Sequence, residues 1–208
     1  RSRFLDNTTE LYGGQFRFAL GGAVASFGPT SVAGCEFSRN SAGAGYASRG
    51  GALFFSANYG TAIFVVDSTF SANLASSPLN AEGGAIHIAN GGATLARNAF
   101  LGSTASGDER ALGGAVHAGG IFLRSFNNTY FGNQAMSDAG SGVASGGAIS
   151  LANDDDARLT NDTIAGNRAT GGDTAVGGIA LPGDGIVHIA NTLIADNIGV
   201  NCGHEGTC

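Results

Sequence analysis

The chain of 208 residues is glycine-rich and weakly charged, yet 43% of its residues are hydrophobic, which is enough for one domain or one elongated repeat array. This composition excludes an intrinsically disordered chain. The net charge is −6, all ten basic residues are Arg, and no cluster of them could neutralise a run of phosphates, so no nucleic acid partner is expected. Apolar runs such as 61–66 fall far short of the roughly 20 residues that span a bilayer, so no direct membrane span is expected.

Two short markers recur along the chain with a common period. The first is a Gly-Gly-apolar string, found as GGAV at 21, GGAL at 50, GGAI at 83, GGAV at 113, GGAI at 146 and GGIA at 177. The second is an aromatic or aliphatic residue followed three places later by Asn, with Phe100/Ser103 filling one gap. Its members are Phe4/Asn7, Phe37/Asn40, Phe70/Asn73, Tyr130/Asn133, Ile164/Asn167 and Ile194/Asn197. Two independent markers with one period of about 30 residues indicate a repeat architecture.

The residue types of each unit favour short strands over helices. Glycine pairs and Ser, Thr and Asn are poor helix formers, and no apolar pattern of helical period accompanies them. Five and seven places before each anchor, apolar residues lie two apart and so share one face of a strand. These inward columns are Val32, Val65, Leu95, Ser125, Leu159 and Ile189, and Thr30, Ile63, Ala93, Leu123, Ala157 and Val187. Three places before the anchor, a corner is predicted at Gly34, Asp67, Arg97, Asn127, Asn161 and Asn191.

Each unit therefore reads as one coil of about three short strands, and stacked coils form a parallel β-helix. The predicted fold is an all-β parallel β-helix (solenoid) of about seven coils, 30–34 residues each, with a single domain over 1–201 and a loop over 202–208. The Asn column is interpreted as structural, because Asn tolerates a left-handed corner and stacked amides can hydrogen-bond from coil to coil. Its members are Asn7, Asn40, Asn73, Asn133, Asn167 and Asn197.

The segments TFSANLA, TYFGNQA and TIAGNRA, alternating with GGAI and GGAV, resemble the repeats of polymorphic outer-membrane proteins and of bacterial β-helix repeat proteins of the cell surface. The resemblance implies a right-handed β-helix at an extracellular bacterial surface, and right-handed crossovers are also the general preference for parallel strands. In such surface proteins the last coil often ends in a Cys-containing loop, which residues 197–208 resemble. Pectin-lyase-type enzymes share this fold, so the resemblance leaves function open.

The three cysteines allow at most one disulfide. Cys202 and Cys208 enclose the five residues GHEGT and are predicted to close a disulfide loop, which implies an extracellular or periplasmic compartment. Cys35 is interpreted as a small, buried, unpaired thiol. The alternative is zinc binding by Cys202, His204 and Cys208, which would require a fourth ligand that the sequence does not supply.

A glycan-cleaving β-helix would need carboxylates that converge from neighbouring coils, and no carboxylate pair stacks on adjacent coils in this register. Asp67 next to Arg97 is the nearest approach to such an arrangement. Asp154, Asp155 and Asp156 are weak candidates for a Ca²⁺ site, although a solvated acidic turn is the commoner explanation of such a run. No catalytic residue, metal or cofactor is assigned.

His87 and His117 occupy the same place in neighbouring coils. Since Ile86 and Val116 are the natural inward residues, strand alternation points both imidazoles outward. Two imidazoles without a further ligand make a weak metal site. We therefore expect a solvent-facing pair without a special role.

Two functions from different classes remain. The preferred one is a non-enzymatic structural or adhesive module of an extracellular bacterial surface protein or filament, presenting a rigid rod for contact with other protein chains or glycans. Phe4 has almost no strand before it, and an uncovered β-helix end exposes unpaired backbone, so another chain or upstream residues are expected to pack there. The alternative is a carbohydrate-active, pectin-lyase-like polysaccharide lyase or glycoside hydrolase.

Overall fold

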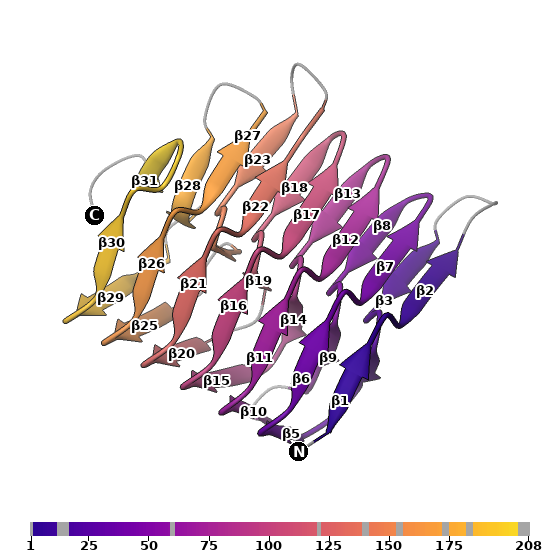
Figure 1. Cartoon of the computed structure of the whole chain (residues 1–208), viewed down its shortest axis with the longest axis horizontal. Helices are drawn as coiled ribbons and strands as arrows, with labels where there is room; N and C mark the ends of the chain where they lie inside the picture. The colour runs from indigo at the N-terminus through magenta and orange to yellow at the C-terminus, as the bar shows by residue number, and fades with distance from the viewer. Residues whose placement is uncertain are drawn as a thin grey trace.

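The chain is an all-β parallel β-solenoid of about six turns (Figure 1). The computed structural model describes residues 2–11, 17–58, 61–119, 122–138, 142–152, 156–171, 175–181 and 185–203, of which residues 200–203 are described by their backbone only. These residues contain no helix, and hence none of the length and apolar character needed to cross a membrane. The predicted count of seven coils was one too high, because seven anchor strands stacked in one sheet enclose only six turns.

Four parallel sheets run along the rod, and each strand pairs with its equivalent in the next turn. Sheet A carries the anchors and consists of β1 (Arg3–Leu5), β6 (Glu36–Ser38), β11 (Thr69–Ser71), β16 (Ala99–Leu101), β21 (Thr129–Phe131), β26 (Thr163–Ala165) and β30 (Leu193–Ala195). Sheet B consists of β2 (Thr8–Leu11), β7 (Ser41–Ala44), β12 (Leu74–Ser77), β17 (Thr104–Gly107), β22 (Gln134–Met136) and β27 (Arg168–Thr170).

Sheets C and D complete each turn. The first row of sheet C is β3 (Phe18–Leu20), β8 (Ala47–Arg49), β13 (Asn80–Glu82), β18 (Arg110–Leu112) and β23 (Val143–Ser145), and the second is β4 (Val24–Ser26), β9 (Leu53–Ser56), β14 (Ile86–Asn90), β19 (Val116–Ala118) and β24 (Ile149–Leu151). The two rows join at β28 (Val176–Ala180), which also pairs with β31 (Val200–Gly203). Sheet D is β5 (Thr30–Ala33), β10 (Ala62–Val66), β15 (Gly92–Ala96), β20 (Phe122–Phe126), β25 (Asp156–Thr160) and β29 (Val187–Ala190).

A complete turn contains five strands, not the three that were predicted; β6 to β10 form one such turn. The two additional strands come from the variable segment between each Asn and the next Gly pair. That segment is rich in Ala, Ser and Gly, and its own residues show no apolar alternation. These segments form strands because each pairs with the equivalent segment of the neighbouring turns. The residue pattern within one unit does not show this pairing.

The five strands divide the molecule into a main body and an arm. Sheets A and D and the second row of sheet C enclose the large apolar core. Sheet B packs on the first row of sheet C to form the arm, which projects from the body at the top of Figure 1. The arm interior consists of small residues in three clusters, namely Ala19, Ala42 and Ala44; Ala75, Ala81 and Ala105; and Ala111, Ala135, Ala144 and Ala169. Methyl groups are short enough to let the two sheets of the arm lie close together.

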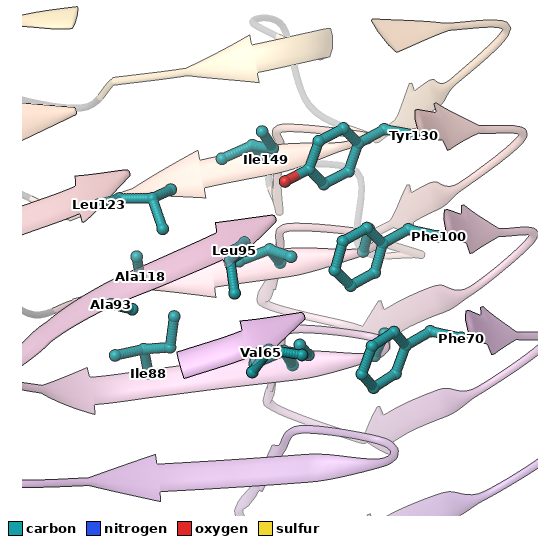
Figure 2. Close-up of a cluster of buried hydrophobic side chains, with 14 of the residues drawn as sticks. Val65, Phe70, Ile88, Ala93, Leu95, Phe100, Ala118, Leu123, Tyr130 and Ile149 are labelled. Atoms are coloured by element: carbon teal, nitrogen blue, oxygen red, sulfur yellow. The ribbon is translucent and has the colours of Figure 1, made fainter. Parts of the chain in front are cut away.

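Aromatic side chains stack in a continuous column through the core. The rings of Phe4, Phe37, Phe70, Phe100 and Tyr130 lie 4.7 to 4.9 Å apart between centroids, with planes within 11° of parallel. That spacing is the distance between neighbouring parallel strands, so the backbone pairing imposes the stacking. Figure 2 shows the last three rings beside the inward aliphatic column of sheet D. The predicted inward columns are confirmed in the central turns and become partly exposed only in the edge strands β5 and β29.

Left-handed residues mark two corners in each turn. The predicted corner, three places before the anchor, is confirmed by positive φ angles of 49° to 62° at Gly34, Asp67, Arg97, Asn127, Asn161 and Asn191. A second corner lies immediately before each Asn of the ladder and before Ser103, which fills its gap; the corner residues are Asp6, Arg39, Ala72, Gly102, Gly132, Gly166 and Asp196. The Asn residues themselves are therefore not left-handed, so the expectation that Asn is used here because it tolerates a left-handed corner is wrong. The residue before each Asn makes the turn.

The Gly-Gly pair forms the neck where the arm joins the body. Gly83 has a φ of +69°, and a Cβ at that position would lie 2.1 Å from the carbonyl oxygen of Ile86. A Cβ on Gly84 would lie 2.1 Å from the carbonyl oxygen of Gly114 in the next turn and 2.5 Å from the backbone of Thr104 in sheet B. Sheets B and C thus approach at the neck more closely than any side chain permits.

Replacing the second glycine of the neck should therefore destabilise the whole rod. We expect Gly114→Ala to lower the free energy of unfolding by about 3 kcal/mol or more, because its Cβ would meet the backbone of Gly147 at 2.2 Å and of Gln134 at 2.5 Å. Chemical denaturation followed by circular dichroism measures the change. The control is Gly45→Ala, whose Cβ would have no atom within 4 Å and which should be nearly neutral. Equal stability of the two variants would contradict this account of the neck.

Candidate functional site

The Asn column forms a hydrogen-bonded ladder along sheet A. Asn133 shows the pattern: its Nδ2 donates to Asn167 Oδ1 at 2.9 Å and to the carbonyl of Phe100 at 3.0 Å, while its Oδ1 accepts from the backbone N of Ser103 at 3.0 Å. The equivalent bonds join Asn7 to Asn40, Asn40 to Asn73 and Asn167 to Asn197. The predicted amide hydrogen bonds between coils are present. Because the same side chains also bond to backbone groups, we keep the interpretation that this column is structural.

A second ladder, which the sequence analysis missed, lies at the other corner. Its members directly follow the left-handed residues three places before each anchor, and each accepts a hydrogen bond from the backbone of the preceding turn. They are Ser68, Asn98, Asn128, Asp162 and Thr192. These positions recur with the same period of about 30 residues, but their residue types differ, so the sequence shows no obvious motif. What they share is a side-chain oxygen in one position.

Asp162 is the charged member of this second ladder and belongs to a buried polar cluster. Its Oδ1 accepts from the backbone N of Asn128 at 2.7 Å, while its Oδ2 is buried and has no partner among the described residues. Burial raises the pKa of Asp162 above its usual value of 3.8. Ser125 joins the cluster through Tyr130 Oη at 2.9 Å and Asn128 Nδ2 at 3.0 Å. Ser125 thus takes the place of an aliphatic residue in its inward column at the same turn in which Tyr130 takes the place of a Phe, and the two hydroxyls bond to each other.

Asp67, the carboxylate considered for catalysis, is paired with an arginine at an exposed corner, and Asp6 is paired in the same way. Asp67 accepts two hydrogen bonds from Arg97, at 2.7 and 2.8 Å, and Asp6 accepts two from Arg39 at the same distances. The hydrogen bonds from Arg97 hold the pKa of Asp67 below its usual value, so this carboxyl stays ionised and is poorly suited to act as a general acid. Each pair joins neighbouring turns at an exposed corner.

The Ca²⁺ candidates and the predicted disulfide fall largely beyond the residues that the structure describes. Asp154 and Asp155 lie outside them, and Asp156 is an exposed residue at the start of β25. Cys208 and His204 are also outside, so the Cys202–Cys208 disulfide and the zinc alternative stay predictions. No disulfide forms among the described residues, where Cys35 is a free thiol that is partly rather than fully buried.

The two stacked histidines are buried, which corrects the expectation that they face solvent. His87 is 3% exposed and His117 is 5% exposed. Alternation does direct them away from the main core, but Phe54 stacks on the His87 ring at 5.5 Å, and the His117 ring lies 5.2 Å away on the other side. The sheet bends at the neck, so the residue before the Gly pair reaches back toward this column. Strand alternation alone does not account for that bend.

That residue is Glu82, which completes a cluster of three potential metal ligands that the sequence analysis missed. One ligand atom from each of Glu82, His87 and His117 lies within 4.8 Å of the other two, and Glu82 Oε2 is 3.5 Å from His87 Nδ1. Arg49 Nε donates to Glu82 Oε2 at 2.8 Å and so holds the carboxylate in place. The signal was the acidic residue that opens the string EGGAIHIAN, five places before the histidine.

The imidazoles of this cluster are neutral over the physiological range. Burial lowers the pKa of His117 to about 4, with the carboxylate of Glu82 opposing the shift and the charges of Arg110 and Arg49 adding to it. Burial likewise lowers the pKa of His87 well below its usual value, and His117 and Arg49 add to that shift. Neutral imidazole carries a free lone pair, which is the form that ligates metals.

The outer face of sheet D, here called the D face, is largely exposed to solvent. Its central column, one residue per strand, consists of Ser31, Phe64, Thr94, Arg124, Arg158 and His188. Phe64 is 45% exposed, and the Arg124 guanidinium lies 4.7 Å from the ring centre of Phe122. A shallow depression lies at each end, one beside Phe64 and the other beside Arg158 and His188. The D face therefore combines cationic, aromatic and hydroxyl groups in register.

Comparison with known proteins found no matching family model, and no curated protein or solved structure that matches the chain. The fold assignment accordingly rests on the strand pairing.

Truncating one amide of the Asn ladder should show how much that ladder contributes to the free energy of unfolding. We expect Asn133→Ala to lower the free energy of unfolding by about 2 to 4 kcal/mol, because it leaves the buried N–H of Ser103 and the carbonyl of Phe100 without their partners. Urea denaturation measures the change. The half-buried neighbour Gln134 provides the control, since Gln134→Ala should cost less than about 1 kcal/mol. A ladder amide as dispensable as Gln134 would contradict the structural interpretation.

Asp162→Asn should stabilise the protein in a pH-dependent way. A carboxyl whose pKa is raised by folding keeps its proton to higher pH in the folded chain, so the wild type loses stability as pH rises above 3.8 through the folded pKa. The Asn variant avoids that loss and can donate as Asn98 and Asn128 do, so we expect about 1 to 2 kcal/mol of added stability at pH 7. Denaturation at pH 4 and pH 7 measures it. Asp67→Asn, where Arg97 lowers the pKa, should show the opposite sign.

Proposed function

We propose that the chain is a non-enzymatic structural or adhesive module of an extracellular bacterial surface protein or filament. Its rod presents flat sheet faces to other protein chains or to glycans. The proposal rests on the D face, where inter-coil pairing holds outward side chains in one rigid column. The surface location follows from the resemblance of the repeats to those of bacterial cell-surface proteins.

The chemistry of the D face suits an acidic partner. Arg124 and Arg158 pair in register on neighbouring strands, which places two guanidinium-bearing side chains side by side at a strand spacing of roughly 4.8 Å. Neither forms an ion pair with another described residue, although Asp156 lies on the same face two residues before Arg158. Two adjacent Arg side chains can bind carboxylate or sulfate groups in a forked geometry. The exposed ring of Phe64 adds surface on which a sugar can stack, and the partly buried ring of Phe122 lies against the Arg124 guanidinium.

The alternative is a carbohydrate-active enzyme of the pectin-lyase type. Asp67 and Arg97 remain its best-placed candidates, and their mutual pairing disfavours it because the carboxylate is already neutralised by its neighbour. The two functions predict different fates for a bound polysaccharide. A contact module leaves the chain length unchanged, whereas a lyase or hydrolase shortens it.

Removing the paired arginines should weaken binding to an acidic polysaccharide. We expect Arg124→Ala/Arg158→Ala to reduce the affinity for polygalacturonate about tenfold and to flatten its salt dependence, since each exposed charge contributes up to about 1 kcal/mol. Biolayer interferometry at two ionic strengths measures both effects. Arg168→Ala is the matched control, because Arg168 is an exposed arginine on the arm in β27.

Two outcomes would contradict the proposal. Equal binding by the double variant and by Arg168→Ala would show that the D face does not contact the polysaccharide. New reducing ends or unsaturated sugar products after incubation of the wild type with polysaccharide would show an enzyme instead of a contact module. Retained chain length together with weaker binding by the double variant supports it.

A further inference from the structure

We propose that Glu82, His87 and His117 form a transition-metal site that binds one divalent ion, Zn²⁺ or a neighbouring transition metal. The inference does not depend on the contact function of the D face. The three residues come from two adjacent turns of sheet C, with Glu82 at the end of β13, His87 in β14 and His117 in register with it in β19. Strand pairing therefore places the ligands without any contribution from a loop.

The distances fit a small ion. A tetrahedral Zn²⁺ with bonds of about 2.0 to 2.1 Å separates neighbouring ligand atoms by roughly 3.3 Å. Glu82 Oε2 and His87 Nδ1 are already 3.5 Å apart, and all three ligand atoms lie within 4.8 Å. Side-chain rotations that move each donor by roughly 1 Å or less would bring the set onto one ion. The rings are tilted by 38°, so two imidazoles can direct nitrogens toward a common point.

Burial without partners is the independent observation that points to a ligand. The Nδ1 atoms of His87 and His117 are both inaccessible to solvent and have no hydrogen-bond partner among the described residues. A buried polar atom left unpaired costs about 1 to 3 kcal/mol, and native proteins rarely keep two side by side without a bound water or ion. A metal ion between the histidines and the carboxylate would satisfy them.

The donor set selects the class of ion. Two imidazoles and one carboxylate suit Zn²⁺ and its neighbours Co²⁺, Ni²⁺ and Cu²⁺, whereas Ca²⁺ and Mg²⁺ require mostly oxygen ligands. Three protein ligands leave a fourth position for water or another small ligand. Arg49 orients the carboxylate and also opposes a cation by its charge, but its side chain is 32% exposed, so water screens part of that repulsion.

Neighbouring turns supply matched variants that the column already tolerates. Phe54 occupies the position of His87 one turn earlier, and Ser150 occupies that of His117 one turn later. His87→Phe and His117→Ser thus install residues that stack in this same column, while Glu82→Gln keeps the shape of the third ligand. His188→Ala removes another exposed histidine, and the double variant Cys202→Ser/Cys208→Ser removes two of the three residues of the C-terminal zinc alternative, neither of them touching the cluster.

The test is metal binding by the full chain after treatment with a chelator. Calorimetric titration with Zn²⁺ should give one ion per chain, and Co²⁺ should give the visible absorption bands of a tetrahedral site with nitrogen and oxygen ligands. Each ligand variant should weaken Zn²⁺ binding about 100-fold or more, since even residues that only orient metal ligands contribute 10 to 100-fold. Zn²⁺ should raise the melting temperature of the wild type, and of neither histidine variant. Excess Ca²⁺ or Mg²⁺ should not compete.

Three results would overturn the assignment. One is the absence of saturable Zn²⁺ binding by the folded wild type. Another is unchanged affinity in Glu82→Gln, His87→Phe and His117→Ser. The third is loss of binding in the cysteine double variant while the histidine variants retain it, which would place the ion at the C-terminal loop. Circular dichroism identifies any variant that does not fold, and the isosteric Glu82→Gln then decides the case.

Discussion

Parallel hydrogen bonding between successive turns is the constraint on which the rest of this structure depends. It sets every residue beside its equivalents one turn before and after, at a spacing of about 4.8 Å. Only side chains that tolerate their own kind as neighbours can then fill a column. Aromatic rings meet this requirement by stacking from Phe4 to Tyr130, and amides meet it by donating to the next amide, as in the Asn ladder. Charged residues instead avoid their own kind by pairing with an opposite charge in the next turn, as Arg97 does with Asp67.

The same constraint explains the shape of each turn. The arm exists because two strands of small residues pair with their equivalents along the rod, although neither strand would be stable alone. Its alanine interior brings sheets B and C together, and at the neck the backbones touch where a Cβ would not fit. The Gly pair is therefore a steric requirement of the architecture. Its position also bends sheet C and directs Glu82 back onto the neighbouring column.

The most informative places in the molecule are the columns whose side chains do not satisfy one another from turn to turn. His87 and His117 stack with unpaired nitrogens in a buried site, and Arg124 and Arg158 stack with like charges on an open face. Asp162 interrupts a neutral ladder with a carboxyl whose pKa burial raises. Each exception leaves a group whose polar or charged character is not fully satisfied within the described chain. A metal ion would satisfy the first and an acidic partner the second, whereas the third is a local cost to stability.

The sequence by itself determined the period, the membership of the anchor, Asn and inward columns, the all-β parallel solenoid and the corner three places before each anchor, because stacked turns repeat their chemistry at one fixed interval. Strand alternation also separated inward from outward residues in sheet D. Only the tertiary structure decided that a turn has five strands, that His87 is buried and that Glu82 lies beside it. These features depend on how the arm folds back at the neck. The Gly pair marks the neck in every turn, but its period does not show the path of the chain there, because that path is set by backbone contacts between turns.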